Sequence, residues 1–112
     1  LIKPMTNDNA IKLTNAQLKQ YRALAHKLQP IVTIAGNGLS DSVLAEIDRA
    51  LNDHELIKIK VVMGDRALRD ALIAQLCPSA RATLVQRIGN TATLLRRSSE
   101  PDPRKSNLQK LR

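Results

Sequence analysis

The stretch Ile31-Val32-Thr33-Ile34-Ala35-Gly36-Asn37-Gly38-Leu39-Ser40-Asp41 decides the fold of this chain. Its first four residues are apolar or β-branched and predict a strand, whereas residues 39–47 have the amphipathic spacing of a helix. The two glycines between them predict a turn that leaves backbone N–H groups unpaired at the positive end of the helix dipole. Such a junction between a strand and a helix is suited to bind an anion.

Three helices are expected, over about residues 14–29, 40–53 and 65–76. Thr14 and Gln17 have the spacing of a capping box, which opens the first helix. Ser40 or Asp41 is suited to be the N-cap of the second helix. Cys77-Pro78 is expected to end the third helix, because proline does not continue a helix.

Four strands are expected, over about residues 31–34, 56–63, 82–88 and 91–96. In the second of these, three apolar residues alternate with Lys58 and Lys60, which predicts a core side and a positively charged side. Gly89-Asn90 predicts a tight hairpin between the last two strands. The order α-β-α-β-α-β-β, with helical crossovers after the first two strands, predicts a compact two-layer α/β sandwich with a mixed four-stranded sheet.

The composition predicts a single basic domain. The chain has 112 residues, with 18 Lys and Arg against 10 Asp and Glu and a formal net charge of +8. This length allows one domain with a modest core. The excess of positive charge favours a polyanionic partner such as nucleic acid, and the alternative is a soluble protein that is merely basic.

The expected boundaries divide the chain into three parts. Residues 1–12 are an N-terminal extension in which Met5 is the expected natural start, with residues 1–4 added before it, and residues 13–97 form the domain. From Ser98 onward prolines and basic residues predict a flexible tail over residues 98–112. The lone Cys77 excludes an internal disulfide, and no apolar run approaches the roughly 18 residues of a membrane span. We therefore expect a cytoplasmic protein with no membrane partner.

The glycine turn has several interpretations. A dinucleotide fingerprint needs a third glycine where Asp41 stands, and a P-loop needs a Lys-Ser/Thr pair that is absent here. A plain turn from strand to helix remains an alternative. KH-type modules approach the RNA backbone with a glycine-containing loop at a helix start. Because Tyr21 is the one aromatic residue and lies on the predicted buried stripe of its helix, we expect recognition through backbone and charge rather than base stacking.

Basic side chains form the second part of the candidate site. Lys19, Arg22 and His26 share one face of the first helix, although a solvated charged face is the commoner explanation of such a stripe. Lys58 and Lys60 join them only if no other element covers their side of the sheet.

Enzymatic chemistry has little support in this sequence. His26 and His54 lie on different predicted elements without the spacing of metal ligands, and no Ser, His and acid constellation is identifiable. The acidic residues between Glu46 and Glu55 are explained by a solvated helix end. We therefore expect no catalytic residue, no metal and no cofactor.

Several sequence blocks, in order along residues 13–97, carry a family resemblance. They include Leu24-Ala25-His26, Gly36-Asn37-Gly38-Leu39-Ser40, Val43-Leu44-Ala45-Glu46-Ile47, His54-Glu55-Leu56-Ile57-Lys58-Ile59-Lys60 and Ile88-Gly89. In these blocks the chain resembles the CRM domain family (chloroplast RNA splicing and ribosome maturation), particularly its free-standing bacterial members of the YhbY type.

The resemblance implies a fold akin to the carboxy-terminal domain of bacterial translation initiation factor three. It also implies a GxxG loop that contacts RNA, and association with precursors of the large ribosomal subunit. The matching window here is Ala35-Gly36-Asn37-Gly38, in which Ala35 replaces the first family glycine. Asn90 stands where lysine is common in the family and Leu95 where tyrosine is common, and each change removes one possible RNA contact.

These observations together predict a non-catalytic, monomeric RNA-binding protein that binds large-subunit rRNA and assists ribosome assembly. The expected RNA contacts are Ala35, Gly36, Asn37, Gly38, Lys19, Arg22, His26, Lys58, Lys60 and Arg96. The alternative is an adaptor that docks an acidic protein on the ribosome, and a small enzyme acting on a phosphate ligand is a third, weaker hypothesis. Replacing Asn37 by glutamate should abolish binding to protein-free rRNA only if the first prediction holds.

Overall fold

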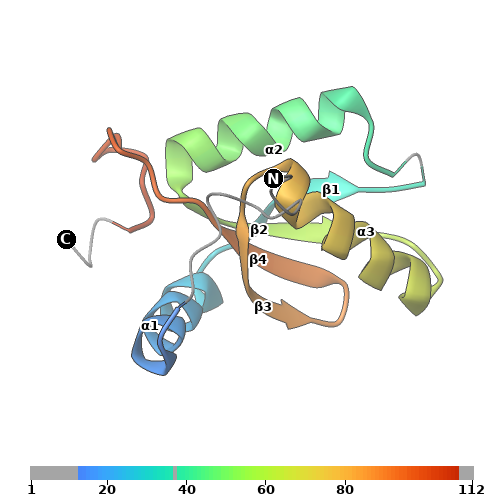
Figure 1. Ribbon diagram of the computed structural model, residues 1–112, viewed down its shortest axis with the longest axis horizontal. Helices are drawn as coiled ribbons and strands as arrows, with labels where there is room; N and C mark the ends of the chain where they lie inside the picture. Colours follow the sequence, from blue (N-terminus) through green and yellow to red (C-terminus); the bar gives the residue numbers. More distant parts are fainter. Residues whose placement is uncertain (1–12, 37, 109–112) are drawn as a thin grey trace, which may run out of the picture.

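The computed structural model describes residues 13–36 and 38–108. Its elements are α1 (Asn15–His26), β1 (Pro30–Ile34), α2 (Asp41–His54), β2 (Leu56–Val61), α3 (Arg66–Ser79), β3 (Thr83–Ile88) and β4 (Thr91–Leu95). The predicted order α-β-α-β-α-β-β is confirmed (Figure 1).

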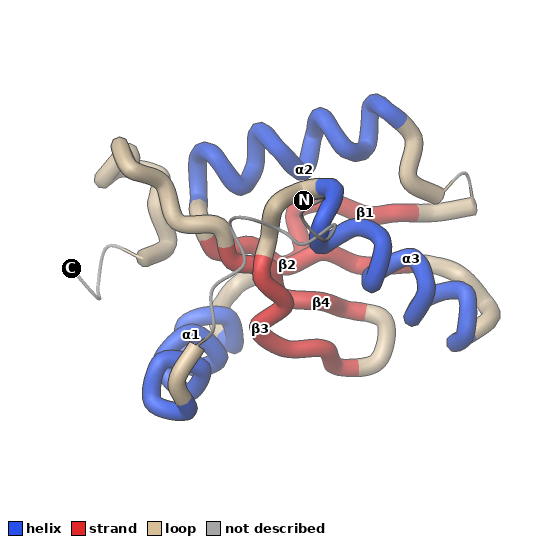
Figure 2. Tube along the Cα trace, in the orientation of Figure 1, coloured by secondary structure: helices blue, strands red, loops and turns tan. Residues whose placement is uncertain are grey.

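The four strands form one mixed sheet in the order β1-β2-β4-β3 (Figure 2). β1 and β2 are parallel and are connected by α2, whereas β4 pairs antiparallel with both β2 and β3. A parallel pair needs such a crossover, because both strands run in the same direction. The mixed four-stranded sheet was therefore predicted correctly.

One face of the sheet is covered by α2 and α3 and carries the larger hydrophobic core. The alternation in β2 directs Ile57, Ile59 and Val61 into this core, where they pack with buried residues of both helices. Lys60 is exposed on the opposite face and Lys58 is half-buried there. The predicted separation of core and charge along β2 is confirmed.

Helix α1 packs on the opposite face and covers only one end of the sheet (Figure 1). Tyr21 and Ala25 of α1 contact a second core that contains Leu56 of β2 and Leu95 of β4. Tyr21 is 6% exposed, which confirms its assignment to the core. The capping box is also confirmed, since the Gln17 N–H donates to Thr14 Oγ1 at 3.1 Å and the Thr14 N–H donates to Gln17 Oε1 at 3.0 Å.

Helix α3 continues through Pro78 to Ser79, so the expected end before Cys77-Pro78 is wrong. Pro78 lies in the last turn, where its missing N–H removes a single helical hydrogen bond. The helix ends when Arg81 adopts a φ of +53° and the Ala82 N–H donates to the Cys77 carbonyl oxygen at 2.9 Å. A backbone reversal, rather than the proline, terminates this helix.

Residues 98–108 pack against the domain, so the expectation of a flexible tail is wrong for this part of it. Leu108 is 3% exposed and belongs to the same core as Tyr21. Two groups of the tail, the Ser98 N–H and the Ser106 hydroxyl, donate to the Glu55 carboxylate at 2.6 and 2.7 Å. The expected solvation of Glu55 is wrong for the same reason, because this side chain is buried beneath the tail. Residues 1–12 and 109–112 lie outside the described residues.

Candidate nucleic-acid interface

The turn after β1 lies at the edge of the sheet where the parallel strands end. Because β1 and β2 run in the same direction, the segments that follow them emerge together. The Val62 N–H donates to the Ile34 carbonyl oxygen at 2.7 Å, and the Val61 N–H donates to the Asn90 carbonyl oxygen at 2.7 Å. The β1–α2 loop, the β2–α3 loop and the β3–β4 hairpin therefore share this edge (Figure 2). We call it the carboxyl edge.

The β1–α2 loop is a tight turn that leads into the N-cap of α2. The Gly38 N–H donates back to the Ala35 carbonyl oxygen at 2.9 Å, and Gly38 has a φ of +66°. Glycine adopts this conformation without the steric cost that a side chain would add. Ser40 is the N-cap, since its hydroxyl accepts from the Val43 N–H at 3.2 Å. Of the two predicted N-caps, Ser40 is correct.

The loop is open to solvent. Ala35 and Gly36 are exposed, and a Cβ added at Gly36 or Gly38 would meet no atom within 4 Å. Within the described part of the chain, the N–H groups of Gly36 and Leu39 have no hydrogen-bond partner. These groups precede the positive end of the α2 dipole, so the backbone here presents donors suited to an anion. Asn37 lies outside the described residues.

The three cations predicted on α1 are all exposed and lie at a distance from this loop. Lys19, Arg22 and His26 belong to the helix that covers the other face of the sheet, near the start of β2 (Figure 1). Arg22 Nε also donates to the Val85 carbonyl oxygen of β3 at 3.4 Å, which holds this side chain beside the sheet. The structure therefore does not bring the α1 cations and the loop into one compact cluster.

Lys58 and Lys60 lie between these two regions. Lys60 is exposed and pairs in register with Thr33 of β1, while Lys58, nearer α1, is half-buried. The uncovered face of the sheet thus carries positive charge from α1 toward the carboxyl edge. This arrangement gives a long basic surface rather than a pocket, as expected of a protein that contacts an extended polyanion.

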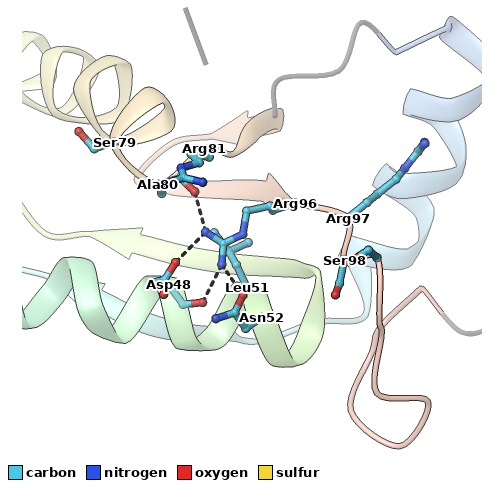
Figure 3. A pocket seen from close by; sticks show the side chains of 10 residues that line it. Asp48, Leu51, Asn52, Ser79, Ala80, Arg81, Arg96, Arg97 and Ser98 are labelled. Atoms are coloured by element: carbon cyan, nitrogen blue, oxygen red, sulfur yellow. Dashed lines mark hydrogen bonds and ion pairs between the residues drawn. The ribbon is translucent and has the colours of Figure 1, made fainter. Parts of the chain in front are cut away.

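Arg96 is engaged inside the protein (Figure 3). Its Nη1 donates to Asp48 Oδ1 at 2.8 Å and to the Ala80 carbonyl oxygen at 2.9 Å, and its Nη2 donates to the Asp48 carbonyl oxygen and Asn52 Oδ1, both at 2.9 Å. These bonds join β4 to α2 and to the end of α3. The side chain is 11% exposed, and the carboxylate of Asp48 offsets its charge. The geometry explains Arg96 as a structural residue, although we predicted it as an RNA contact.

Arg97 extends the basic side of α1 and was not among the predicted contacts. Its Nε and Nη2 donate to the Tyr21 hydroxyl at 3.1 and 2.6 Å, and its guanidinium carbon lies 5.7 Å from the ring centroid. The residue is exposed. The available signal was the alternation of the strand that precedes them: continued past Leu95, the end of β4, it turns the neighbours Arg96 and Arg97 to opposite sides.

The described residues present no group of three or more His, Cys, Asp or Glu side chains that could hold a metal ion. His54 Nδ1 forms a hydrogen bond with the Lys105 carbonyl oxygen at 2.8 Å. Burial raises the pKa of the Cys77 thiol, which disfavours the reactive thiolate. No helix in the described ranges is both long and apolar enough to cross a membrane.

The structure is that of a small α/β protein with an open glycine loop at one edge of its sheet and exposed cations on one face of it. The CRS1/YhbY (CRM) domain family matches residues 13–96. The chain belongs to this family, as the sequence blocks indicated. The match ends just before the tail, so residues 98–108 pack on the domain from outside the family match.

Curated relatives span nearly the same length. A protein of Pseudomonas aeruginosa named "Probable RNA-binding protein" is 45% identical over 98 residues, which cover 88% of this chain and 94% of the relative. A Haemophilus influenzae protein named "RNA-binding protein" is 44% identical, covering 79% and 89%. YqeI of Bacillus subtilis, named "Probable RNA-binding protein", is 35% identical, covering 79% and 92%.

A solved structure has the same fold. It is the solution structure of a hypothetical protein of Staphylococcus aureus, described as a candidate for RNA binding. The TM-score is 0.69 at 34% sequence identity, and the match covers 80% of this chain and 93% of the other.

Proposed function

We propose that this protein is a non-catalytic RNA-binding protein that binds rRNA in precursors of the large ribosomal subunit and assists their assembly. The observation that carries the proposal is the open β1–α2 loop in a chain of net charge +8. Its Gly36 and Leu39 N–H groups have no hydrogen-bond partner among the described residues and precede a helix N-terminus. The names of the relatives support RNA as the ligand. The ribosomal target follows from the family resemblance.

The loop binds the RNA backbone in this proposal. Gly36 and Gly38 allow a phosphate to approach closely, since no side chain stands between the ligand and the backbone donors. Lys60 and the exposed cations of α1 contact further phosphates along the open face of the sheet. Because such contacts position RNA without reading its bases, the protein recognises RNA shape more than sequence. It acts as a monomer in the cytoplasm.

Crosslinking in cells, followed by sequencing of the attached RNA, tests the target. We expect large-subunit rRNA to dominate the crosslinked reads, and we expect sucrose gradients to place the protein with precursor particles. The variant Asn37→Glu tests the role of the loop, because an added carboxylate repels phosphate and should remove the rRNA signal. Crosslinks spread over unrelated transcripts, or an rRNA signal that survives in this variant, would contradict the proposal. The second result would favour the adaptor alternative.

A further inference from the structure

A group of arginines surrounds a pocket at the carboxyl edge. Arg66 and Arg69 lie in the first turn of α3, and Arg87 lies near the end of β3. With Gly89 of the hairpin they line a pocket of about 360 Å³. None of these residues belongs to the predicted contact set, so the pocket is a separate feature of the surface.

Arginines at the start of a helix are electrostatically unfavourable. The N-terminus of a helix carries the positive end of the dipole, so anions stabilise it and cations destabilise it. The first turn of α3 contains no acidic residue. Its N-cap Asp65 supplies the nearest negative charge, and Asp65 Oδ1 accepts from the Ala67 N–H at 2.8 Å. A bound anion would offset the repulsion that this arrangement creates.

The arginines are only partly neutralised. Among the described residues, the Arg66 guanidinium has no hydrogen bond or ion pair, and Arg69 donates through Nη1 to the Met63 carbonyl oxygen at 2.8 Å. Arg69 Nε is buried without a partner in the same part of the chain. Arg87 forms an ion pair with Asp70. Three arginines against Asp65 and Asp70 leave an excess of one positive charge, to which the helix dipole adds.

The pocket and the β1–α2 loop lie on the same edge and on the same side of the sheet. The β3–β4 hairpin is hydrogen-bonded to the end of β2 through Asn90 and Val61, and β2 is bonded to the end of β1 through Val62 and Ile34. Neighbouring strands lie about 4.8 Å apart. In the order β1-β2-β4-β3, β4 is therefore about 10 Å from β1, and β3, which carries Arg87, is about 14 Å from it. One extended polynucleotide can therefore reach both positions.

We propose that Arg66, Arg69 and Arg87 form a second phosphate-binding site, which binds a backbone phosphate of the same RNA that contacts the β1–α2 loop. Guanidinium groups suit this ligand, because they donate paired hydrogen bonds to phosphate oxygens. The inference rests on the proposed RNA binding and extends it to the N-terminus of α3. The RNA then follows the carboxyl edge and contacts two helix N-termini in succession.

The test compares Arg66→Gln with Arg49→Gln. Arg49 is an exposed residue of α2 away from the pocket, so both variants lose the same charge from the same kind of side chain. We expect Arg66→Gln to weaken binding to an rRNA fragment about three- to tenfold at low salt, and to flatten the dependence of log affinity on log salt by about one. Arg49→Gln should change either quantity far less.

Nuclear magnetic resonance distinguishes RNA from a small anion as the occupant. We expect the Gly89 amide signal to shift on addition of the rRNA fragment to the wild-type protein, and to remain unshifted in Arg66→Gln. A shift with inorganic phosphate alone, and none with RNA, would assign the pocket to a small anion and overturn the inference.

The failures of the two proposals are distinguishable. Equal RNA affinities and salt slopes for Arg66→Gln and Arg49→Gln, with intact binding by the wild-type protein, would overturn the second site and leave the loop proposal standing. Absence of RNA binding by the wild-type protein would overturn the proposed function and the second site with it.

Discussion

Arg96 and Arg66 have the same charge but different surroundings. Arg96 directs four hydrogen bonds to Asp48, Asn52 and Ala80, and these bonds hold β4, α2 and the end of α3 together. Arg66 has no such partner among the described residues. The partners of a side chain, rather than its charge, therefore separate a structural arginine from one that is available to a ligand.

The role of Arg96 gives a prediction for stability. Arg96→Gln should lower the free energy of unfolding by about 2 to 4 kcal/mol, because the Ala80 carbonyl and the Asp48 carboxylate lose a charged donor. Urea unfolding followed by circular dichroism measures this change. The RNA affinity of the folded variant should match that of Arg49→Gln. A stable Arg96→Gln with specifically weakened RNA binding would instead make Arg96 a direct RNA contact.

Cys77 gives a prediction for pH dependence. Burial raises the pKa of its thiol above the ordinary value of 9.0, so the folded state favours the protonated form. The unfolded chain therefore loses this proton at lower pH than the folded protein does, and the contribution to stability falls as the pH rises through the range above the ordinary value. Unfolding free energies between pH 8 and 10.5 should decline less in Cys77→Ala than in the wild-type protein. Parallel curves would contradict this assignment.

The sequence could not predict the role of Arg96, because its side-chain partners Asp48 and Asn52 are 48 and 44 residues away in the chain. The exposed positions of Lys19, Arg22 and Lys60 were predictable, because helical and strand periodicity place each of them opposite apolar neighbours. Local patterns therefore predict exposure, whereas pairing between distant elements decides what an exposed or half-buried cation contacts.

At the scale of the elements, local signals explain why most boundaries were predicted. The capping box at Thr14, the cap at Ser40 and the alternation in β2 each depend on residues only a few positions apart. The tail has no such local signal. The tail is ordered because Leu108 packs in the core beside α1. It is also held by hydrogen bonds to Glu55 from Ser98 and Ser106, which follow it by 43 and 51 positions in the chain.

The packing of the tail gives a prediction for the free energy of unfolding. Leu108→Ala should lower the free energy of unfolding by about 2 to 4 kcal/mol, because it leaves a cavity between α1 and the sheet. The exposed Arg104 in the same segment offers a matched control, and Arg104→Ala should change stability by less than about 0.5 kcal/mol. Thermal and urea unfolding measure both variants. Equal stabilities for the two would show that the tail does not pack on the domain in solution.

At the scale of the whole molecule, positive charge is distributed over two surfaces that meet at the carboxyl edge. One surface is the open sheet face with Lys60 and the exposed cations of α1, and the other contains the β1–α2 loop and the arginine pocket. The helices α2 and α3 start at this edge and present their N-termini there (Figure 1). A polyanion that binds this edge can contact both surfaces at once.

This distribution explains why RNA affinity should depend strongly on salt. Each phosphate neutralised by a lysine or arginine releases condensed counterions, so log affinity falls linearly with log salt with a slope near the number of contacts. If about four cations engage phosphate, as the exposed side chains allow, the slope for single-stranded RNA is about −3. The loop contributes backbone donors without charge, so its variants should alter affinity more than slope.

A comparison of Gly36→Glu with Gly36→Gln tests whether the open β1–α2 loop binds the RNA backbone. A Cβ added at Gly36 meets no atom within 4 Å, and Gly36 is not among the residues with a positive φ, so both variants should fold as the wild-type protein does. In titrations of a large-subunit rRNA fragment, we predict at least about tenfold weaker binding for Gly36→Glu than for Gly36→Gln, because a carboxylate repels phosphate. Equal affinities for the two variants would show that the loop does not bind the RNA backbone.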